Sequence, residues 1–114
     1  MTGVQTCALP IYEYLKRLGI EPISNCFQEF SIADRYSAVE IIDTYERFFK
    51  EAQSDYRLLT ELVVVLTQKV LQHSEIPHQQ RVAELYGNLL DKTEKYALNN
   101  LQGEELEYYH KIAD

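Results

Sequence analysis

The stretch from residue 58 to residue 71 constrains the fold most, because it is the densest apolar run in the chain. It reads LLTELVVVLTQKVL, and neither Gly nor Pro occurs from residue 55 to residue 76. Its three successive valines favour a buried strand when they are taken alone. The apolar residues of the whole stretch, however, recur at three- and four-residue steps, which is typical of a helix. The pattern therefore predicts a buried helix over about residues 55–74, with polar side chains at the other positions: Glu61, Gln68, Lys69 and Gln72.

Two further long helices are predicted, one on each side of this stretch. The first covers residues 31–53, with Ser31 as its N-terminal cap. The residues expected on its apolar face are Ile32, Tyr36, Val39, Ile42, Tyr45, Phe49 and Ala52. Since no Gly or Pro marks the junction near residue 54, a single kinked helix over residues 31–74 stays open as an alternative. The second covers residues 77–102, after a turn at residues 74–78, because Pro77 disfavours the helical conformation of the residue before it.

Shorter helices are predicted over residues 12–18 and 104–112, and residues 20–30 are expected to form a loop. Gly103 is expected to end the helix before it. Gly87 lies inside a predicted helix, where close approach of another backbone would explain it. Together these elements predict an all-α protein, a small helical bundle forming one domain over residues 12–114.

Residues 1–11 read MTGVQTCALPI and resemble the translation of a sequencing-library adapter. Segments of this kind are left out of fold reasoning. We therefore expect these residues to be an artefact and the native N-terminus to be missing. Cys7 then drops out of the cysteine count, which leaves Cys26 alone.

The composition limits the possible partners. The net charge of −7 opposes nucleic-acid binding, which depends on Lys and Arg neutralising phosphates. No apolar run approaches the roughly 18–20 residues that a membrane-spanning helix needs. A lone Cys26 offers no disulfide framework and fits a reducing cytoplasm. We expect a cytoplasmic protein without direct contact to nucleic acid or membrane.

The pattern Glu-x-x-His, which supplies metal ligands in di-iron bundles, occurs at residues 75–78 and 107–110. Pro77 breaks the first copy across a turn, and the second lies on a short terminal helix. His73 and His78 could share a zinc ion, but with one Cys no complete ligand set is visible. An exposed loop with two histidines is the preferred interpretation. We therefore expect no metal and no cofactor. If a metal were bound, the candidate ligands would be His73, His78, Glu107 and His110.

No catalytic motif stands out. Cys26 could be a nucleophile, but a lone Cys beside Phe27 is more often a small apolar filler. The chain contains no Gly-rich phosphate loop. We therefore predict a protein without enzymatic activity.

The C-terminal helix is a candidate partner surface, because tyrosine buries a large area at low entropic cost. The expected surface comprises Glu104, Glu105, Leu106, Tyr108, Tyr109 and Ile112. The alternative is that this helix only closes the bundle.

The stretch from Thr60 to Leu66 with Gln72 and His73, and the tail from Asn100 to Tyr109, resemble uncharacterised small acidic helical proteins from gut-bacterial genomes and mobile elements. The resemblance implies a bacterial or phage cytoplasmic setting and no mechanism. We predict an interaction or regulatory module that binds a protein partner or a second copy of itself. One alternative is an acidic inhibitor that mimics nucleic acid at a basic site of a host defence enzyme. Another is a metal-binding helical bundle.

Overall fold

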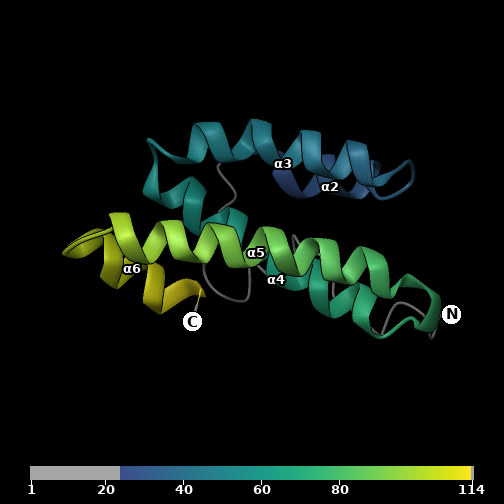
Figure 1. The fold of residues 1–114 in the computed structure, drawn as a ribbon. Helices are drawn as coiled ribbons and strands as arrows, with labels where there is room; N and C mark the ends of the chain where they lie inside the picture. Colours follow the sequence, from purple (N-terminus) through teal and green to yellow (C-terminus); the bar gives the residue numbers. More distant parts are fainter. Residues whose placement is uncertain (1–23, 114) are drawn as a thin grey trace, which may run out of the picture.

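The computed structural model describes residues 24–113, and the predictions for residues 1–11 and 12–18 lie outside this range. Five α-helices and a 3-10 helix, and no strand, make up the described part (Figure 1). They are α2 (Cys26–Ala33), α3 (Ala38–Ala52), α4 (Tyr56–Ser74), the 3-10 helix η2 (Pro77–Gln79), α5 (Gln80–Asn100) and α6 (Glu104–Ala113). The predicted all-α bundle is confirmed.

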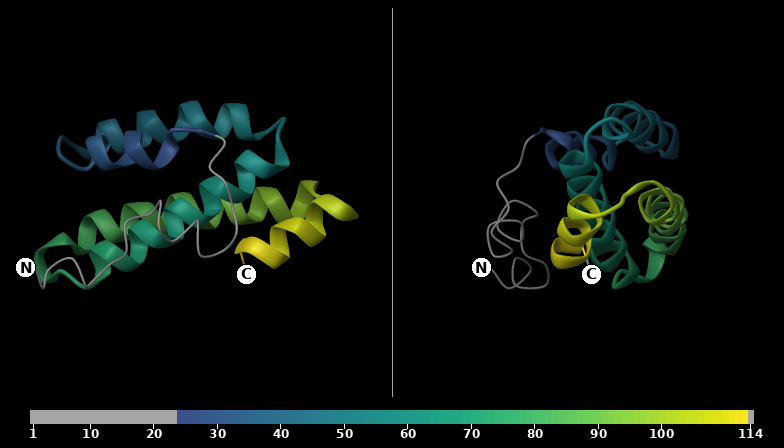
Figure 2. Two further views of the ribbon diagram at one scale, coloured as in Figure 1. Left: turned by 180° about the vertical axis from the view of Figure 1, so that it is seen from behind. Right: turned by 90° about the vertical axis from the view of Figure 1, so that its left-hand side faces the viewer.

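Helix α4 occupies the centre of the bundle and contacts each of the other described helices. The hairpin of α2 and α3 lies on one side of α4, while α5 and α6 pack against it from the other (Figures 1 and 2). Leu62, Val65 and Leu66 of α4 are completely buried. Each such side chain contributes roughly 1.5–3 kcal/mol to stability. Among residues 24–113, no helix is both long and apolar enough to cross a membrane.

The first part of the bundle differs from the prediction. The expected loop over residues 20–30 contains the start of α2, and Ser31 lies inside that helix rather than at the cap of the next. Helix α3 begins at Ala38, where the Ser37 hydroxyl accepts a hydrogen bond from the Glu40 amide at 3.3 Å. Ser37 and Glu40 have the spacing of a capping box. The predicted helix over residues 31–53 is therefore interrupted at residues 34–37, and residues 31–33 belong to α2 instead.

This break also changes which face of α3 is buried. The buried apolar positions are Ile41, Tyr45, Phe48 and Ala52, which follow one another at four- and three-residue steps. The prediction continued the three- and four-residue steps from Ile32 through the turn at residues 34–37. The apolar face that it assigned to α3 was therefore rotated away from the side that packs on the core. Four members of the predicted face are exposed instead: Ile32, Tyr36, Val39 and Ile42.

Later boundaries agree closely with the sequence. Asp55 caps α4 by accepting a hydrogen bond from the Arg57 amide at 3.0 Å, so α3 and α4 are two helices and the single kinked helix is excluded. Pro77 opens η2 after the extended Ile76, as the predicted turn requires. Gly103 adopts a φ of 61° and lies just before α6, where its carbonyl accepts a hydrogen bond from the Glu107 amide; α5 has already ended at Asn100.

Candidate functional site

Three of the four polar side chains that interrupt the apolar pattern of α4 lie inside the bundle. Glu61, Gln68 and Lys69 are 1%, 7% and 2% exposed. His73, predicted to lie in an exposed loop, is buried in the last turn of α4. Buried charges are costly unless they are paired and hydrogen-bonded, so their partners define a candidate site.

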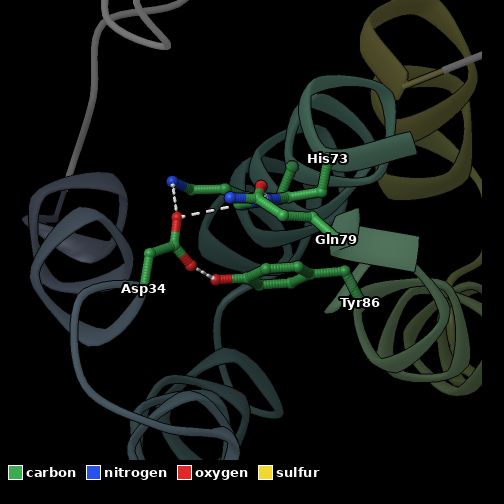
Figure 3. Close-up of polar contacts among 5 residues, drawn as sticks. Asp34, His73, Gln79 and Tyr86 are labelled. Carbon is green, nitrogen blue, oxygen red and sulfur yellow. Dashed lines mark hydrogen bonds and ion pairs between the residues drawn. The ribbon is translucent and has the colours of Figure 1, made fainter. Parts of the chain in front are cut away.

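The carboxylate of Asp34, just after α2, is the centre of this site (Figure 3). Its Oδ2 accepts from Lys69 Nζ at 2.5 Å and from His73 Nε2 at 3.2 Å. Its Oδ1 accepts a hydrogen bond from the Tyr86 hydroxyl on α5. Gln79 of η2 completes the group through a 2.6 Å contact between its Oε1 and His73 Nδ1. We call these five residues the Asp34 cluster.

The surroundings of His73 suit its charged form. Both ring nitrogens face oxygen atoms that accept, and only the doubly protonated ring donates from both. The hydrogen bond to Asp34 raises the pKa of His73, and this effect exceeds the opposing effect of burial. The ring also stacks on Tyr86, with 5.5 Å between the ring centroids.

The surroundings of Asp34 and Tyr86 favour the charged carboxylate and the neutral phenol. Burial alone would raise the pKa of Asp34, but the hydrogen bonds from His73, Lys69 and Tyr86 lower it below its ordinary value. Burial first, and the bond to Asp34 second, raise the pKa of Tyr86, so the phenol keeps its proton. Asp34 therefore accepts three donors, and the cluster ties the end of α2 to α4, η2 and α5.

A second buried carboxylate, Glu61, lies near the start of α2. Its Oε1 accepts from the Ser24 hydroxyl at 2.9 Å and from the Cys26 thiol at 3.4 Å. Burial first, and the Glu61 charge second, raise the pKa of Cys26. Since the thiolate is the nucleophilic form, this environment favours the interpretation of Cys26 as a core residue.

The metal-ligand candidates lie in two separate places. His73 is at the end of α4 and His78 is in η2, whereas Glu107 and His110 are on α6. Helix α6 packs near the start of α4, where Tyr108 contacts Tyr56. The 17 residues from the start of α4 to His73 span about 25 Å of helix. In residues 24–113, no group of three or more His, Cys, Asp and Glu side chains is placed to hold a metal ion.

The predicted C-terminal surface is divided between the core and solvent. Tyr109 is 2% exposed and belongs to the core, and Leu106 and Ile112 pack against it. Glu104, Glu105 and Glu107 are exposed in the first turn of α6, where acidic groups stabilise a helix. The apolar half of this helix thus closes the bundle, and a partner surface on its acidic half stays a prediction.

A different surface, which the sequence assigned to the core, carries exposed apolar side chains. It lies where α2 turns into α3 (Figure 1). Val39 and Tyr36 are 73% and 70% exposed, and Ile32 and Ile42 are 51% and 38% exposed. Val39 and Ile42 are one helical turn apart and so share a face of α3. We call Ile32, Tyr36, Val39 and Ile42 the corner surface.

A cavity of about 120 Å³ lies beside the turns that join α3 to α4 and α5 to α6. Its polar lining is largely engaged within the chain. Asp55 caps α4, and the Tyr96 hydroxyl donates to the Gln53 carbonyl at 3.4 Å. Most polar groups of this cavity are therefore already engaged and not free to bind a ligand.

Comparisons with known proteins add no assignment: no family model, curated protein or solved structure matches this chain.

Proposed function

We propose that this chain is a non-enzymatic interaction module that binds another polypeptide through the corner surface. The observation that carries the proposal is the exposure of four large apolar side chains at one end of the α2–α3 hairpin. Single exposed apolar residues are ordinary, but a group of them marks an interaction site. Burying Tyr36 or Val39 against a partner would contribute roughly 1.5–3 kcal/mol each.

The Asp34 cluster supports this function indirectly. Asp34 lies between Ile32 and Tyr36 in the chain, and its hydrogen bonds to α4 and α5 hold the turn that presents both side chains. The turn is further fixed by the Tyr36 amide, which donates to the Ala33 carbonyl at 3.0 Å. A pre-ordered surface loses less conformational entropy on binding, so the cluster serves affinity rather than chemistry.

A bacterial or phage cytoplasm is the proposed setting. The described Cys26 is a free, buried thiol, which is compatible with a reducing compartment. The resemblance of the central stretch and the tail to proteins of gut bacteria and mobile elements points to the same setting.

A photo-crosslinking experiment tests the proposal. Photoreactive benzoylphenylalanine would replace Val39 in one variant and Leu98 in a control. Leu98 is 54% exposed on α5, outside the corner surface. The concentrated protein, alone and with a bacterial cell extract, would be irradiated and its adducts identified by mass. We expect adducts with a defined polypeptide from position 39 and none from position 98. Equal, unspecific adducts from both positions would refute a binding role for this surface.

A further inference from the structure

We infer that the occupant of the corner surface is a second copy of this chain, packed antiparallel across a two-fold axis near Val39. This inference rests on the proposed function and adds the identity of the partner. A two-fold interface brings the same patch of both copies together, so the patch must be complementary to itself. The charges at the two ends of the corner surface meet this requirement.

Opposite charges flank the apolar side chains. Arg35 is exposed in the turn before α3, at one end of the patch, and Asp43 is exposed on α3, at the other. Asp43 follows Val39 by four residues, so the two share a face of the helix about 6 Å apart along the axis. In an antiparallel pair, the end of the corner surface at the turn before α3 faces, in the other copy, the end that lies on α3. Arg35 of each copy then faces Asp43 of its partner.

Both flanking charges are available for such contacts. Within residues 24–113, neither Arg35 nor Asp43 forms an ion pair. The sequence suggests that Arg47 would pair with Asp43 one turn away, but Arg47 instead binds Glu29 of α2 at 3.3 Å. The structure thus uses Arg47 within the hairpin and leaves Asp43 to solvent.

The local charge also favours the corner surface over the acidic first turn of α6 for self-association. The whole chain carries a net charge of −7, so two copies repel each other over most of their surface. Around the corner surface, Arg35 and Arg47 offset part of the charge of four acidic side chains: Glu29, Glu40, Asp43 and Glu46. The first turn of α6, in contrast, carries three glutamates. Repulsion between copies is therefore weaker at the corner surface than at the first turn of α6, and salt near 0.15 M screens the more distant charges.

Sedimentation equilibrium over a concentration series, at 0.15 M salt, tests the inference with complementary charge reversals. Arg35→Glu puts like charges opposite Asp43 in the dimer, and Asp43→Lys puts like charges opposite Arg35. We expect each variant alone to raise the dimer dissociation constant about tenfold. An equimolar mixture should restore the original constant, since both contacts of the mixed dimer then join opposite charges. Circular dichroism would show that each variant stays folded.

Val39→Ser and Leu98→Ser provide the matched apolar controls. Val39→Ser should weaken the dimer at least about tenfold and Leu98→Ser should leave it unchanged. A monomer at every concentration would overturn the inference, and so would a dimer that the mixture fails to restore. If the protein is monomeric but position 39 crosslinks to a different protein in the extract, the proposed function stands and the second copy is wrong. If it is monomeric and position 39 crosslinks to nothing, both are wrong.

Discussion

Replacing Asp34 with Asn tests the central claim that one carboxylate holds the α2 end against α4 and α5. The substitution keeps the size of the side chain and one acceptor oxygen but removes its charge. Lys69 would then lie uncompensated, with its side chain 3% exposed. Removing one partner of a buried ion pair typically costs about 3–5 kcal/mol, because the remaining charge is stranded. We expect a loss near the lower value, since the Asp34 side chain itself is 15% exposed.

A loss of about 3 kcal/mol is a large share of the roughly 5–15 kcal/mol that stabilises a domain of this size. It corresponds to a fall in melting temperature of about 12–24 °C for a chain of about a hundred residues. Urea denaturation followed by circular dichroism would measure it. Glu84→Gln is the matched control, because Glu84 is exposed on α5 and forms no ion pair within residues 24–113. It should change stability by no more than about 0.5 kcal/mol.

The pH dependence distinguishes a lost ion pair from a general packing defect. The pKa of Asp34 is lowered from its ordinary 3.8, so its contribution to the free energy of unfolding is present above pH 3.8. This contribution disappears as the pH falls through the lower pKa that Asp34 has in the folded state. The difference between the wild type and Asp34→Asn should therefore shrink under acid conditions. Adding Lys69→Met to Asp34→Asn should recover part of the loss, because no stranded ammonium remains. A loss from Asp34→Asn no larger than that from Glu84→Gln would refute the reasoning.

Three further outcomes follow from the same structure. The pKa of His73 is raised above 6.5, so its contribution to the free energy of unfolding is full below pH 6.5 and is lost as the pH rises through the pKa of the folded state. His73→Gln should reduce this loss of stability with rising pH, as urea titrations at successive pH values would show. A Cβ at Gly87 meets nothing within 4 Å, so Gly87→Ala should raise stability by about 0.5–1 kcal/mol. Gly103→Ala should lower stability, because Gly103 has a φ of 61°, and thermal melts would show both effects. In a Cys7→Ser background, the buried Cys26 should react with iodoacetamide far more slowly in native protein than in urea, and equal rates would contradict its burial.

The long elements could be predicted because their signals are local and redundant. Helix α4 follows from many apolar residues at regular steps, and one misplaced residue would not change that reading. The start of α3 rests on two serines with nearly equal capping signals: Ser31 has Asp34 three residues later, and Ser37 has Glu40. The structure uses Ser37, and Phe27 and Phe30 are buried in a separate helix, α2. A choice of this kind depends on packing that local sequence does not contain.

The Asp34 cluster shows which features of a buried site the sequence can predict and which it cannot. The steps from Leu62 through Leu66 and Lys69 to His73 are four, three and four residues, so both polar side chains continue the buried stripe of α4. That spacing could have indicated buried charges, because a polar residue on a core stripe needs a partner. It could not name the partner, since Asp34 is 35 residues away from Lys69 and Tyr86 comes from a third helix. The same loop that carries Asp34 inward carries Tyr36 outward. The folding of α2 onto α4 thus creates the anchor and exposes the corner surface in one step, so a variant that loses the anchor should also lose the ordered surface.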